Sequence, residues 1–551
     1  MVVKSLEKNG VKVVFGYPGA ANCPIIDKLS FSSIKHILTR NEQGAAHMAS
    51  GYARVTKGAG VCTATSGPGA TNLITGIATA YMDSVPMVVL TGQVASPLIG
   101  KDAFQEVDIT GATLPFTKHS YLIKDGLDIP RIVNEAFHIA QTGRPGPVLI
   151  DFPMDLLKAE FDYTDVDDSP VIRGYRLLGK PSESQIKKVA DAIKAAERPL
   201  ILAGGGIVSS DAVEEFRLLE TATDIPVVST MMGIGVMKCS DKRYYGMLGS
   251  HGTRVANALA NKADLVVVMG SRLGDRTTAH CMRTLTDKNK LVHIDIDPAE
   301  IGKNVQPRIP VVGDIKDVLK QLSPLLADYK APDTWRSEAE ALREKYAQPL
   351  VTEDTGTVNP KYFLQKLSER MGYDAYISTE VGQNQIWTSN YYNFKNPRLF
   401  MTSGGFGTMG YGLPAAIGAS AAQSEKAVIS VMGDGSFQMN LPEMGTMCQW
   451  DIPVKMVVFR NNRLGMVHEH QFLLYKTNYQ AVHLDGSPDF NKLAEAYGIK
   501  NGYVSENSDI DKAIDEMMKD NESYLLVVEV SPFEPTGDSL NDKTLPEKGD
   551  N

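Results

Sequence analysis

Short runs of aliphatic and β-branched residues recur along this 551-residue chain, and most end in glycine or a polar residue before a segment suited to a helix. Examples are GVCTATSGPG, VPMVVLTGQ, PVLIDFP, RPLILAGGG, DLVVVMGSR, LVHIDIDP, AVISVMGDG and VKMVVFRNN. A run that is apolar at every position suits a strand covered by helices on both faces, as in a parallel sheet. The alternation therefore predicts an α/β fold of doubly wound parallel sheets, with ligands bound beyond the carboxyl ends of the strands.

Two polar stretches interrupt this alternation. One covers residues 162–180, and the other, over residues 328–359, is charged and contains the helix-compatible segment WRSEAEALREKYAQ. At about 150 residues per domain, the length favours three or four domains. We therefore expect three domains and a tail without apolar periodicity, which could act as a flexible lid, at residues 1–162, 181–330, 355–532 and 533–551.

Composition excludes several classes of partner. The net charge is −9 and no block of five like charges occurs, which argues against nucleic acid. No apolar run approaches the roughly 20 residues that span a bilayer, and the N-terminus has neither a signal-peptide nor a transit-peptide pattern. The five cysteines form no Cys-x-x-Cys pair. We expect a cytoplasmic protein that binds neither nucleic acid nor membrane.

Two strand ends in the third domain predict a metal site. AVISVM ends at Gly433-Asp434-Gly435, and VKMVVF ends at Arg460-Asn461-Asn462, where Asn461 stands 27 positions after Asp434. A helix is expected over residues 441–449 between them. The right-handed crossover of a βαβ unit brings both ends to one edge of the sheet. Carboxylate and amide oxygens suit Mg²⁺ completed by a phosphate. Either motif alone is an ordinary turn former, so the pairing and spacing carry the prediction.

This pair resembles the motif with which thiamin-diphosphate enzymes hold Mg²⁺ against the diphosphate of the cofactor. Further stretches, in family order, resemble the catalytic subunits of acetohydroxyacid (acetolactate) synthases; they are FGYPGA, RNEQGAAHMASGYAR, TSGPGATN, DAFQEVDI, GRPGPVLIDFP, MLGSHGT, HIDIDPAEIGKN and TSGGFGTMGYGLPAAIGA. The resemblance implies a pyrimidine-binding, a central FAD-binding-like and a diphosphate-binding domain, in that order.

The family's reaction is the first common step of branched-chain amino-acid synthesis. Pyruvate is decarboxylated on thiamin diphosphate, and the hydroxyethyl unit is condensed with a second 2-oxo acid, either pyruvate or 2-oxobutyrate. Two alternatives stay open. One is another thiamin enzyme of the same fold, such as a pyruvate oxidase or a 2-oxo acid decarboxylase. The other is a catalytically inactive homologue.

Glu42 is the first catalytic candidate. It stands where a helix should begin, and there the helix dipole favours any carboxylate, so an ordinary first-turn role is the alternative. The resemblance implies that Glu42 hydrogen-bonds the aminopyrimidine and promotes the tautomer that removes the thiazolium proton. Such a group needs an apolar pocket that brings its pKa toward the working pH.

The resemblance also implies the residues that hold the thiamin cofactor. Met409 would be a wedge that bends it, although a core methionine is the alternative. The expected cofactor contacts are Val381, Gly382, Gln383, Asn384, Gly407, Met409, Gly433, Gly435, Ser436 and Met466. The expected metal ligands are Asp434, Asn461 and the backbone carbonyl of Arg463.

A flavin is implied for the central domain, although AGGGIV is a weak dinucleotide signal and a flavin-free domain is the alternative. The FAD would be structural, because the net reaction transfers no electrons. The residues implied to line it are Arg144, Gly204, Gly205, His251, Arg272, Asp295 and Asp314.

The acceptor pocket has weaker candidates. Arg276 matches the family position for the acceptor carboxylate, which a guanidinium pairs with in bidentate fashion, and a solvated arginine is the alternative. Gln93 and Lys118 are further pocket candidates. The chain has His470 where the family usually has tryptophan, so we expect a weakened preference for 2-oxobutyrate.

The assembly is implied by where the two halves of the site fall. Glu42 lies in the first domain and Asp434 in the third. In the family these two domains come from different subunits, which implies a homodimer or homotetramer. A small regulatory subunit is a further family partner.

Overall fold

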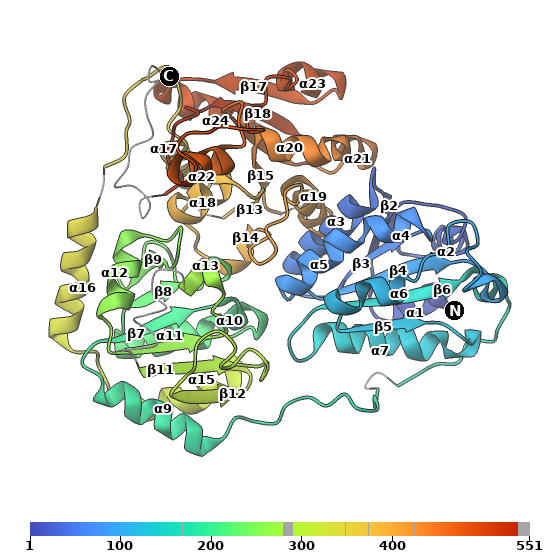
Figure 1. Ribbon diagram of the computed structural model, residues 1–551, viewed down its shortest axis with the longest axis horizontal. Coiled ribbons are helices and arrows are strands. Elements are labelled where there is room, and N and C mark those ends of the chain that lie inside the picture. The colour runs from blue at the N-terminus through green and yellow to red at the C-terminus, as the bar shows by residue number, and fades with distance from the viewer. Residues whose placement is uncertain (168–169, 279–289, 348, 373, 424, 538–551) are drawn as a thin grey trace.

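The computed structural model describes residues 1–167, 170–278, 290–347, 349–372, 374–423 and 425–537. Three six-stranded sheets succeed one another along the chain, and every pairing within them is parallel. Helices flank the sheets, as Figure 1 shows, with the first unit in blue, the central one in green and the third in orange and red. The prediction of an α/β fold with doubly wound parallel sheets is confirmed.

The first sheet has the strand order β2-β1-β3-β4-β6-β5. Its strands are β1 (Val13–Gly16), β2 (Lys35–Leu38), β3 (Gly60–Ala64), β4 (Met87–Gln93), β5 (His119–Leu122) and β6 (Pro147–Pro153). Its helices are α1 (Val2–Lys8), α2 (Cys23–Leu29), α3 (Glu42–Thr56), α4 (Pro68–Asn72), α5 (Ile74–Met82), α6 (Ile109–Thr113), α7 (Ile129–Gln141) and α8 (Met154–Lys158), with 3₁₀ turns η1 (Ser96–Leu98), η2 (Leu114–Phe116) and η3 (Gly126–Asp128).

The central sheet has the order β12-β11-β10-β7-β8-β9. Its strands are β7 (Pro199–Ala203), β8 (Val227–Ser229), β9 (Tyr244–Met247), β10 (Leu265–Met269), β11 (Lys290–Asp295) and β12 (Ile309–Val312). Its helices are α9 (Glu183–Ala195), α10 (Gly205–Ser209), α11 (Val213–Thr223), α12 (Arg254–Lys262), α13 (Asp275–Thr278), α15 (Ile315–Leu325) and α16 (Asp333–Tyr346), with the 3₁₀ turn η4 (Met231–Gly233).

The third sheet has the order β14-β13-β15-β16-β18-β17. Its strands are β13 (Tyr376–Thr379), β14 (Phe400–Met401), β15 (Val428–Gly433), β16 (Lys455–Arg460), β17 (Lys500–Val504) and β18 (Tyr524–Glu529). Its helices are α17 (Pro360–Arg370), α18 (Gln383–Tyr391), α19 (Gly412–Ala422), α20 (Asp434–Asn440), α21 (Met444–Trp450), α22 (Gly465–Leu474), α23 (Phe490–Ala496) and α24 (Ile510–Met517), with 3₁₀ turns η5 (Pro397–Leu399), η6 (Leu441–Glu443) and η7 (Asn507–Asp509).

The apolar runs of the sequence are the strands at the centre of each sheet. Every residue of β3, β4, β6, β7 and β10 is buried, as a strand covered on both faces requires. The helix expected in WRSEAEALREKYAQ is present as α16. Among the described helices, none combines the length and the apolar character needed to cross a membrane.

The crossover between β15 and β16 differs from the single helix expected over residues 441–449. The α-helix α20 begins directly after β15, the 3₁₀ turn η6 follows it, and the α-helix α21 follows η6. Pro442 lies at the start of η6, and because proline has no N–H it suits the first positions of a new turn rather than a helix interior. The crossover therefore presents Glu443 at a break between two helices.

Two helices from distant parts of the sequence join the first and third units. α3 and α19 pack through glycines, so that their backbones nearly touch. A Cβ at Gly51 would lie 2.0 Å from the carbonyl oxygen of Ala415, and a Cβ at Gly418 would lie 1.9 Å from that of Met48. Any side chain at either position must push the two helices apart.

We expect Gly418→Ala to lower the thermal midpoint of the protein by a few degrees. Alanine favours the helix by about 1 kcal/mol, but the clash with backbone belongs to the overpacking that costs about 1–3 kcal/mol. Gly486→Ala is the control, because a Cβ there has no neighbour within 4 Å. Equal midpoints for the two variants, measured by calorimetry, would contradict this account of the helix contact.

Candidate functional site

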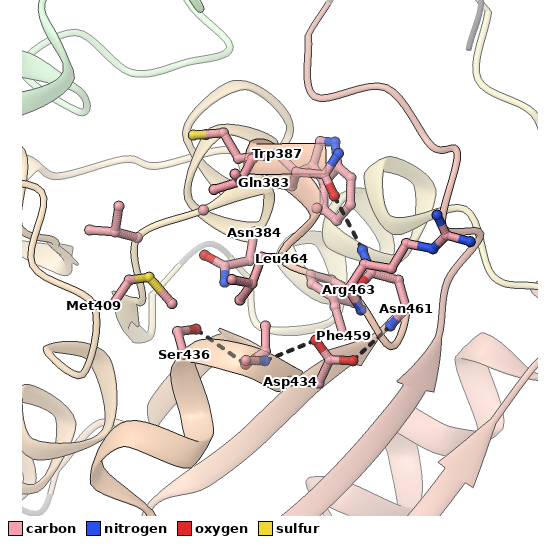
Figure 2. A pocket seen from close by; sticks show the side chains of 17 residues that line it. Gln383, Asn384, Trp387, Met409, Asp434, Ser436, Phe459, Asn461, Arg463 and Leu464 are labelled. Atoms are coloured by element: carbon pink, nitrogen blue, oxygen red, sulfur yellow. Dashed lines mark hydrogen bonds between the residues drawn. The ribbon is translucent and has the colours of Figure 1, made fainter. Parts of the chain in front are cut away.

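A pocket lies at the carboxyl edge of the third sheet, where β13 and β15 are neighbours and the chain order reverses direction. That reversal is the place where open α/β sheets bind ligands. The pocket and the solvent-open space at its mouth together amount to about 470 Å³. Figure 2 shows its walls. The lining residues are Val381, Gly382, Gln383, Asn384, Trp387, Met409, Gly433, Asp434, Gly435, Ser436, Phe459, Asn461, Arg463, Leu464, Gly465, Met466 and Val467.

Asp434 lies at the centre of this edge, as the first residue of α20. One carboxylate oxygen, Oδ2, accepts the backbone N–H of Asn461 at 3.2 Å and that of Asn462 at 2.6 Å. The other, Oδ1, accepts the N–H of Gly435 at 2.9 Å. Burial raises the pKa of Asp434 to about 6, against these hydrogen bonds. The ends of β15 and β16 therefore meet, as the crossover rule predicts.

Asn461 supplies a second oxygen to the same edge. Its Oδ1 accepts the N–H of Arg463 at 3.0 Å, and its Nδ2 donates to Oε1 of Gln383 at 3.2 Å. Within the described residues, no group of three or more His, Cys, Asp or Glu side chains could hold a metal ion. A cation at this edge would need amide and backbone oxygens together with oxygens of a bound ligand.

Asn384, at the start of α18, also faces the pocket, and its Oδ1 is buried without a hydrogen-bond partner among the described residues. Buried polar atoms are almost always paired, so this oxygen fits a ligand that supplies a hydrogen-bond donor. Figure 2 shows the side chain between Met409 and Asp434.

Glu380 anchors the segment that carries Gly407 and Met409 by accepting hydrogen bonds from its backbone. This residue follows β13 and is 1% exposed. Its Oε2 accepts the N–H of Gly410 at 2.6 Å and its Oε1 that of Gly412 at 2.8 Å. Burial raises the pKa of Glu380 to about 7. Sequence reasoning missed Glu380, although an acidic residue directly after a buried strand was a signal.

The beginning of the C-terminal tail lies against the pocket. Nε2 of Gln383 donates to the carbonyl of Glu534 at 2.9 Å, and Nε1 of Trp387 donates to that of Pro535 at 3.0 Å. Thr536 is fully buried and its N–H donates to the carboxylate of Glu469 at 3.2 Å. Of the expected tail, residues 538–551 lie outside the described residues.

Glu42 begins α3, and its side chain is 9% exposed. The side chain of Asn41 caps the helix by accepting the N–H of Gln43 at 2.8 Å. Nδ2 of Asn72 donates to Oε2 of Glu42 at 2.9 Å. Glu42 is not among the residues that line the pocket, all of which come from residues 381–467.

Gln93 ends β4 and lies in a buried hydrogen-bond network. Its Nε2 donates to the carbonyl of Val107 at 2.8 Å and to Oδ2 of Asp151 at 2.9 Å. Asp151 also accepts the hydroxyl of Thr91 at 2.7 Å. Burial raises the pKa of Asp151 to about 7. Asp151, which the sequence reading did not single out, thus fixes the orientation of the Gln93 amide.

Lys118 and Arg276 are placed apart from the pocket. The ammonium of Lys118 donates to the carbonyls of Ile139 and Thr142, near the end of α7, and burial lowers its pKa to about 8. Arg276, in α13, has a side chain that is 78% exposed, and its Nε lies 3.9 Å from Oδ2 of Asp275. In this structure Lys118 stabilises a helix terminus and Arg276 is solvated.

The residues expected to line a flavin gather at the carboxyl edge of the central sheet. Gly204 and Gly205 follow β7, Arg272 follows β10, Asp295 ends β11 and Asp314 follows β12. A Cβ at Gly204 would lie 2.2 Å from the carbonyl oxygen of Gly270, so backbone packs closely between β7 and β10.

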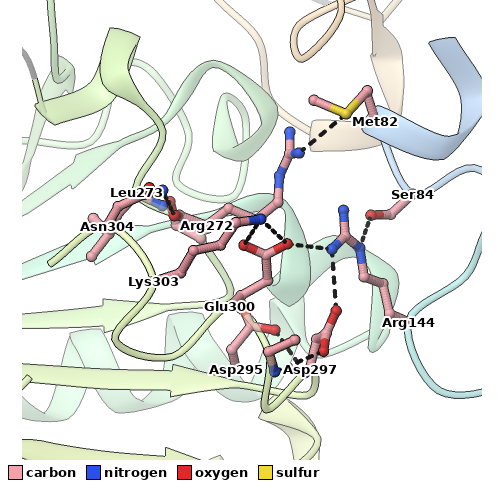
Figure 3. Close-up of polar contacts among 12 residues, drawn as sticks. Met82, Ser84, Arg144, Arg272, Leu273, Asp295, Asp297, Glu300, Lys303 and Asn304 are labelled. Atoms are coloured by element: carbon pink, nitrogen blue, oxygen red, sulfur yellow. Dashed lines mark hydrogen bonds and ion pairs between the residues drawn. The ribbon is translucent and has the colours of Figure 1, made fainter. Parts of the chain in front are cut away.

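Arg144 extends from the first unit to this edge. Its Nη1 pairs with Glu300 at 2.7 Å and with Asp297 at 3.2 Å, and its Nε donates to Ser84 Oγ at 2.9 Å (Figure 3). These ion pairs link the first and central units.

The remaining residues expected to line the flavin differ in burial and in hydrogen-bond partners. Burial, and then the Arg144 charge, lower the pKa of Arg272, whose Nη1 lies 3.8 Å from Sδ of Met82. Burial raises the pKa of Asp295. The side chain of Asp314 caps α15 by accepting the N–H of Lys316. The carbonyl of His251 accepts Nδ2 of Asn390 at 3.0 Å.

Comparison with known families agrees with this geometry. Three models described as the thiamine pyrophosphate enzyme N-terminal TPP binding domain, central domain and C-terminal TPP binding domain match residues 1–112, 186–322 and 380–529. The last of these spans the pocket.

Individual relatives cover nearly the whole chain. A protein named "Probable acetolactate synthase large subunit" from Methanocaldococcus jannaschii is 45% identical over 546 residues, 97% of this chain and 92% of the relative. The acetolactate synthase of Mycobacterium leprae is 44% identical over 90% of this chain and 81% of the relative. The acetolactate synthase large subunit of Porphyra purpurea is 43% identical over 94% of this chain and 89% of the relative.

We expect Asp151 to make the stability of the protein depend on pH. Its pKa rises from 3.8 to about 7 on folding, so the folded chain binds the proton more tightly and stability falls as pH rises through that window. The thermal midpoint of the wild type, relative to Asp151→Asn, should fall by several degrees from about pH 5 to about pH 8. A difference that is constant with pH would contradict the assignment.

Proposed function

This chain belongs to the family of acetolactate synthase large subunits among the thiamine pyrophosphate enzymes, and from that premise we propose that it condenses two molecules of pyruvate to 2-acetolactate. The acceptor is a second 2-oxo acid, with pyruvate favoured over 2-oxobutyrate because of His470. We further infer a cytoplasmic enzyme at the first common step of branched-chain amino-acid synthesis.

The observation that carries the proposal is the convergence of Asp434, Asn461 and Asn384 on one pocket. The donor set consists of oxygens from one carboxylate and one amide, which suits Mg²⁺ bound together with a diphosphate. The unpaired Oδ1 of Asn384 is consistent with a ligand that supplies a donor. On this reading Asp434, Asn461 and the carbonyl of Arg463 hold Mg²⁺.

Thiamin diphosphate, when bound, supplies the thiazolium carbon that adds to a 2-oxo acid and accommodates the electrons left by decarboxylation. The chain's own residues prepare that chemistry. Glu42 holds or releases a proton at its carboxyl, and because Asn72 donates to Oε2, we assign this proton to Oε1. Met409 presents an apolar surface to the cofactor, and Glu380 fixes the segment that carries it.

Two subunits would complete one site. Glu42 belongs to the first unit, while the pocket is lined by residues of the third. We propose a homodimer or homotetramer in which the third unit of one chain faces Glu42 of another. Relatives are named large subunits, which supports a small regulatory subunit as a further partner.

We also propose a structural FAD at the carboxyl edge of the central sheet. The guanidinium of Arg272 is partly buried, and among the described residues it donates a hydrogen bond to the sulfur of Met82, a weak acceptor. A desolvated cation of this kind suits a phosphate oxygen. With a flavin bound, Arg144 would either leave Glu300 and Asp297 to contact the flavin, or keep both ion pairs beside it.

Incubation with pyruvate tests the function. With thiamin diphosphate, Mg²⁺ and FAD, we expect acetolactate without oxygen uptake, measured by product chromatography and an oxygen electrode. Addition of 2-oxobutyrate should leave acetolactate the main product. Peroxide with acetyl phosphate would instead indicate an oxidase, free acetaldehyde a decarboxylase, and no turnover an inactive homologue.

Two variants separate the roles of the two halves of the site. Glu42→Gln should bind the cofactor normally and lose at least about 100-fold in turnover, since it removes the proton-exchanging group. Asp434→Ala should lose Mg²⁺-dependent cofactor binding in calorimetric titration. Unchanged turnover in the first, or unchanged binding in the second, would contradict the roles given to these residues.

A further inference from the structure

A carboxylate from the third unit is buried at the start of the helix that begins with Glu42. Glu443 ends η6 and is fully buried. The turn between β2 and α3 consists of residues 39–41. Figure 1 shows α21, the helix that follows Glu443, beside β2 at the meeting of the two units.

Both oxygens of Glu443 accept backbone hydrogen bonds from that turn. Oε1 accepts the N–H of Arg40 and that of Asn41, each at 3.1 Å. Oε2 accepts the N–H of Arg40 at 3.1 Å and the hydroxyl of Thr446 at 2.6 Å. The peptide groups just before Glu42 therefore take their acceptor from a residue 403 positions further along the chain.

The fit is close on both sides. A Cβ at Gly44, in the first turn of α3, would lie 2.2 Å from Oε1 of Glu443, so only glycine leaves room for the carboxylate. On the other side, Nη2 of Arg40 donates to the carbonyl of Gly445 at 3.0 Å and to Oε1 of Gln449 at 2.9 Å. The turn is thus enclosed by the segment that follows Glu443.

This contact restricts the turn energetically. Burial raises the pKa of Glu443, and the hydrogen bonds from Thr446, Arg40 and Asn41 oppose that rise. A buried N–H that lost its acceptor would carry the desolvation cost of an unpaired polar group. Conformations of the turn that move Arg40 or Asn41 away from the carboxylate are therefore disfavoured.

We propose that Glu443 is a positioning residue for Glu42, which it holds in place through the peptide groups of Arg40 and Asn41. Asn72 orients the Glu42 carboxyl itself, while Glu443 fixes the backbone from which that side chain extends. The inference rests on the proposed function, in which Glu42 exchanges the proton that activates the cofactor.

The test measures exchange of the thiazolium proton of bound thiamin diphosphate for deuterium in the holoenzyme, by acid quench and NMR. Glu443→Ala removes the acceptor and should slow exchange by about 30-fold or more, since a small misplacement of a catalytic group can cost about 100-fold. The cofactor Kd should stay within about threefold, because Asp434 and Asn461 are unchanged. A merely structural role would lower the thermal midpoint without slowing exchange.

Matched variants separate geometry from packing. Glu443→Gln keeps an amide oxygen for the two N–H groups and should stay within about fivefold of the wild type, since the acceptor is retained. Gln449→Ala removes a neighbouring contact to Arg40 and should stay within about twofold. If Glu443→Ala does not fold, Gly44→Ala displaces the carboxylate from the opposite side and should slow exchange in the same way.

The double variant Glu42→Gln/Glu443→Ala should exchange no more slowly than Glu42→Gln alone, because Glu443 acts through Glu42. Full additivity in the double variant, or wild-type exchange in both Glu443→Ala and Gly44→Ala, would overturn the inference. If Glu42→Gln itself exchanged at the wild-type rate, the proposed role of Glu42 would fail instead.

Discussion

Close packing of α3 against α19 is the contact on which the arrangement of the molecule depends. Gly51 and Gly418 have no side chains, so the two helix backbones pack directly against each other at these positions. α3 begins with Glu42, and α19 follows the segment of Gly407 and Met409. One crossing therefore fixes the unit that carries Glu42 against the third unit of the same chain. The hydrogen bonds from Arg40 and Asn41 to Glu443 fix the same two units a few residues away.

The chemistry-bearing residues share one placement, at or just beyond the carboxyl ends of parallel strands. Asp434 follows β15, Asn461 follows β16, Gln93 ends β4 and Asp295 ends β11. Sheets buried on both faces leave polar groups few other positions. Several of these carboxylates are almost fully buried, and the backbone N–H groups of the following turn partly stabilise their charge, as with Asp434 and Glu380. The strands thus supply rigid supports, and the turns supply the polar groups.

Much of this was readable from the sequence, because apolar runs and strand-end motifs are local signals. The fold class and the meeting of Asp434 with the backbone at Asn461 follow from strand order and crossover handedness. The supporting residues Glu380, Glu443, Asp151 and Glu469 were missed, since their partners are tens to hundreds of residues away and their motifs are unremarkable. Lys118 and Arg276 were predicted from family position, and within one chain Lys118 contacts the end of α7 while Arg276 is solvated. Their place in an acceptor pocket stays a prediction. Pro442 also explains why the helix expected over residues 441–449 is divided into the 3₁₀ turn η6 and the helix α21.

The break at η6 limits how this part of the chain can evolve. Asp434, at the start of α20, accepts hydrogen bonds from the turn after β16. Glu443, at the end of η6, accepts them from the turn before α3. Because one residue inserted in a helix rotates everything beyond it by about 100° and advances it by about 1.5 Å, no insertion or deletion between them could preserve both contacts. Exposed positions within the stretch, such as Met439, face no such demand. Selection should thus keep the number of residues from Asp434 to Glu443 constant, while the identities of the solvent-exposed residues between them vary.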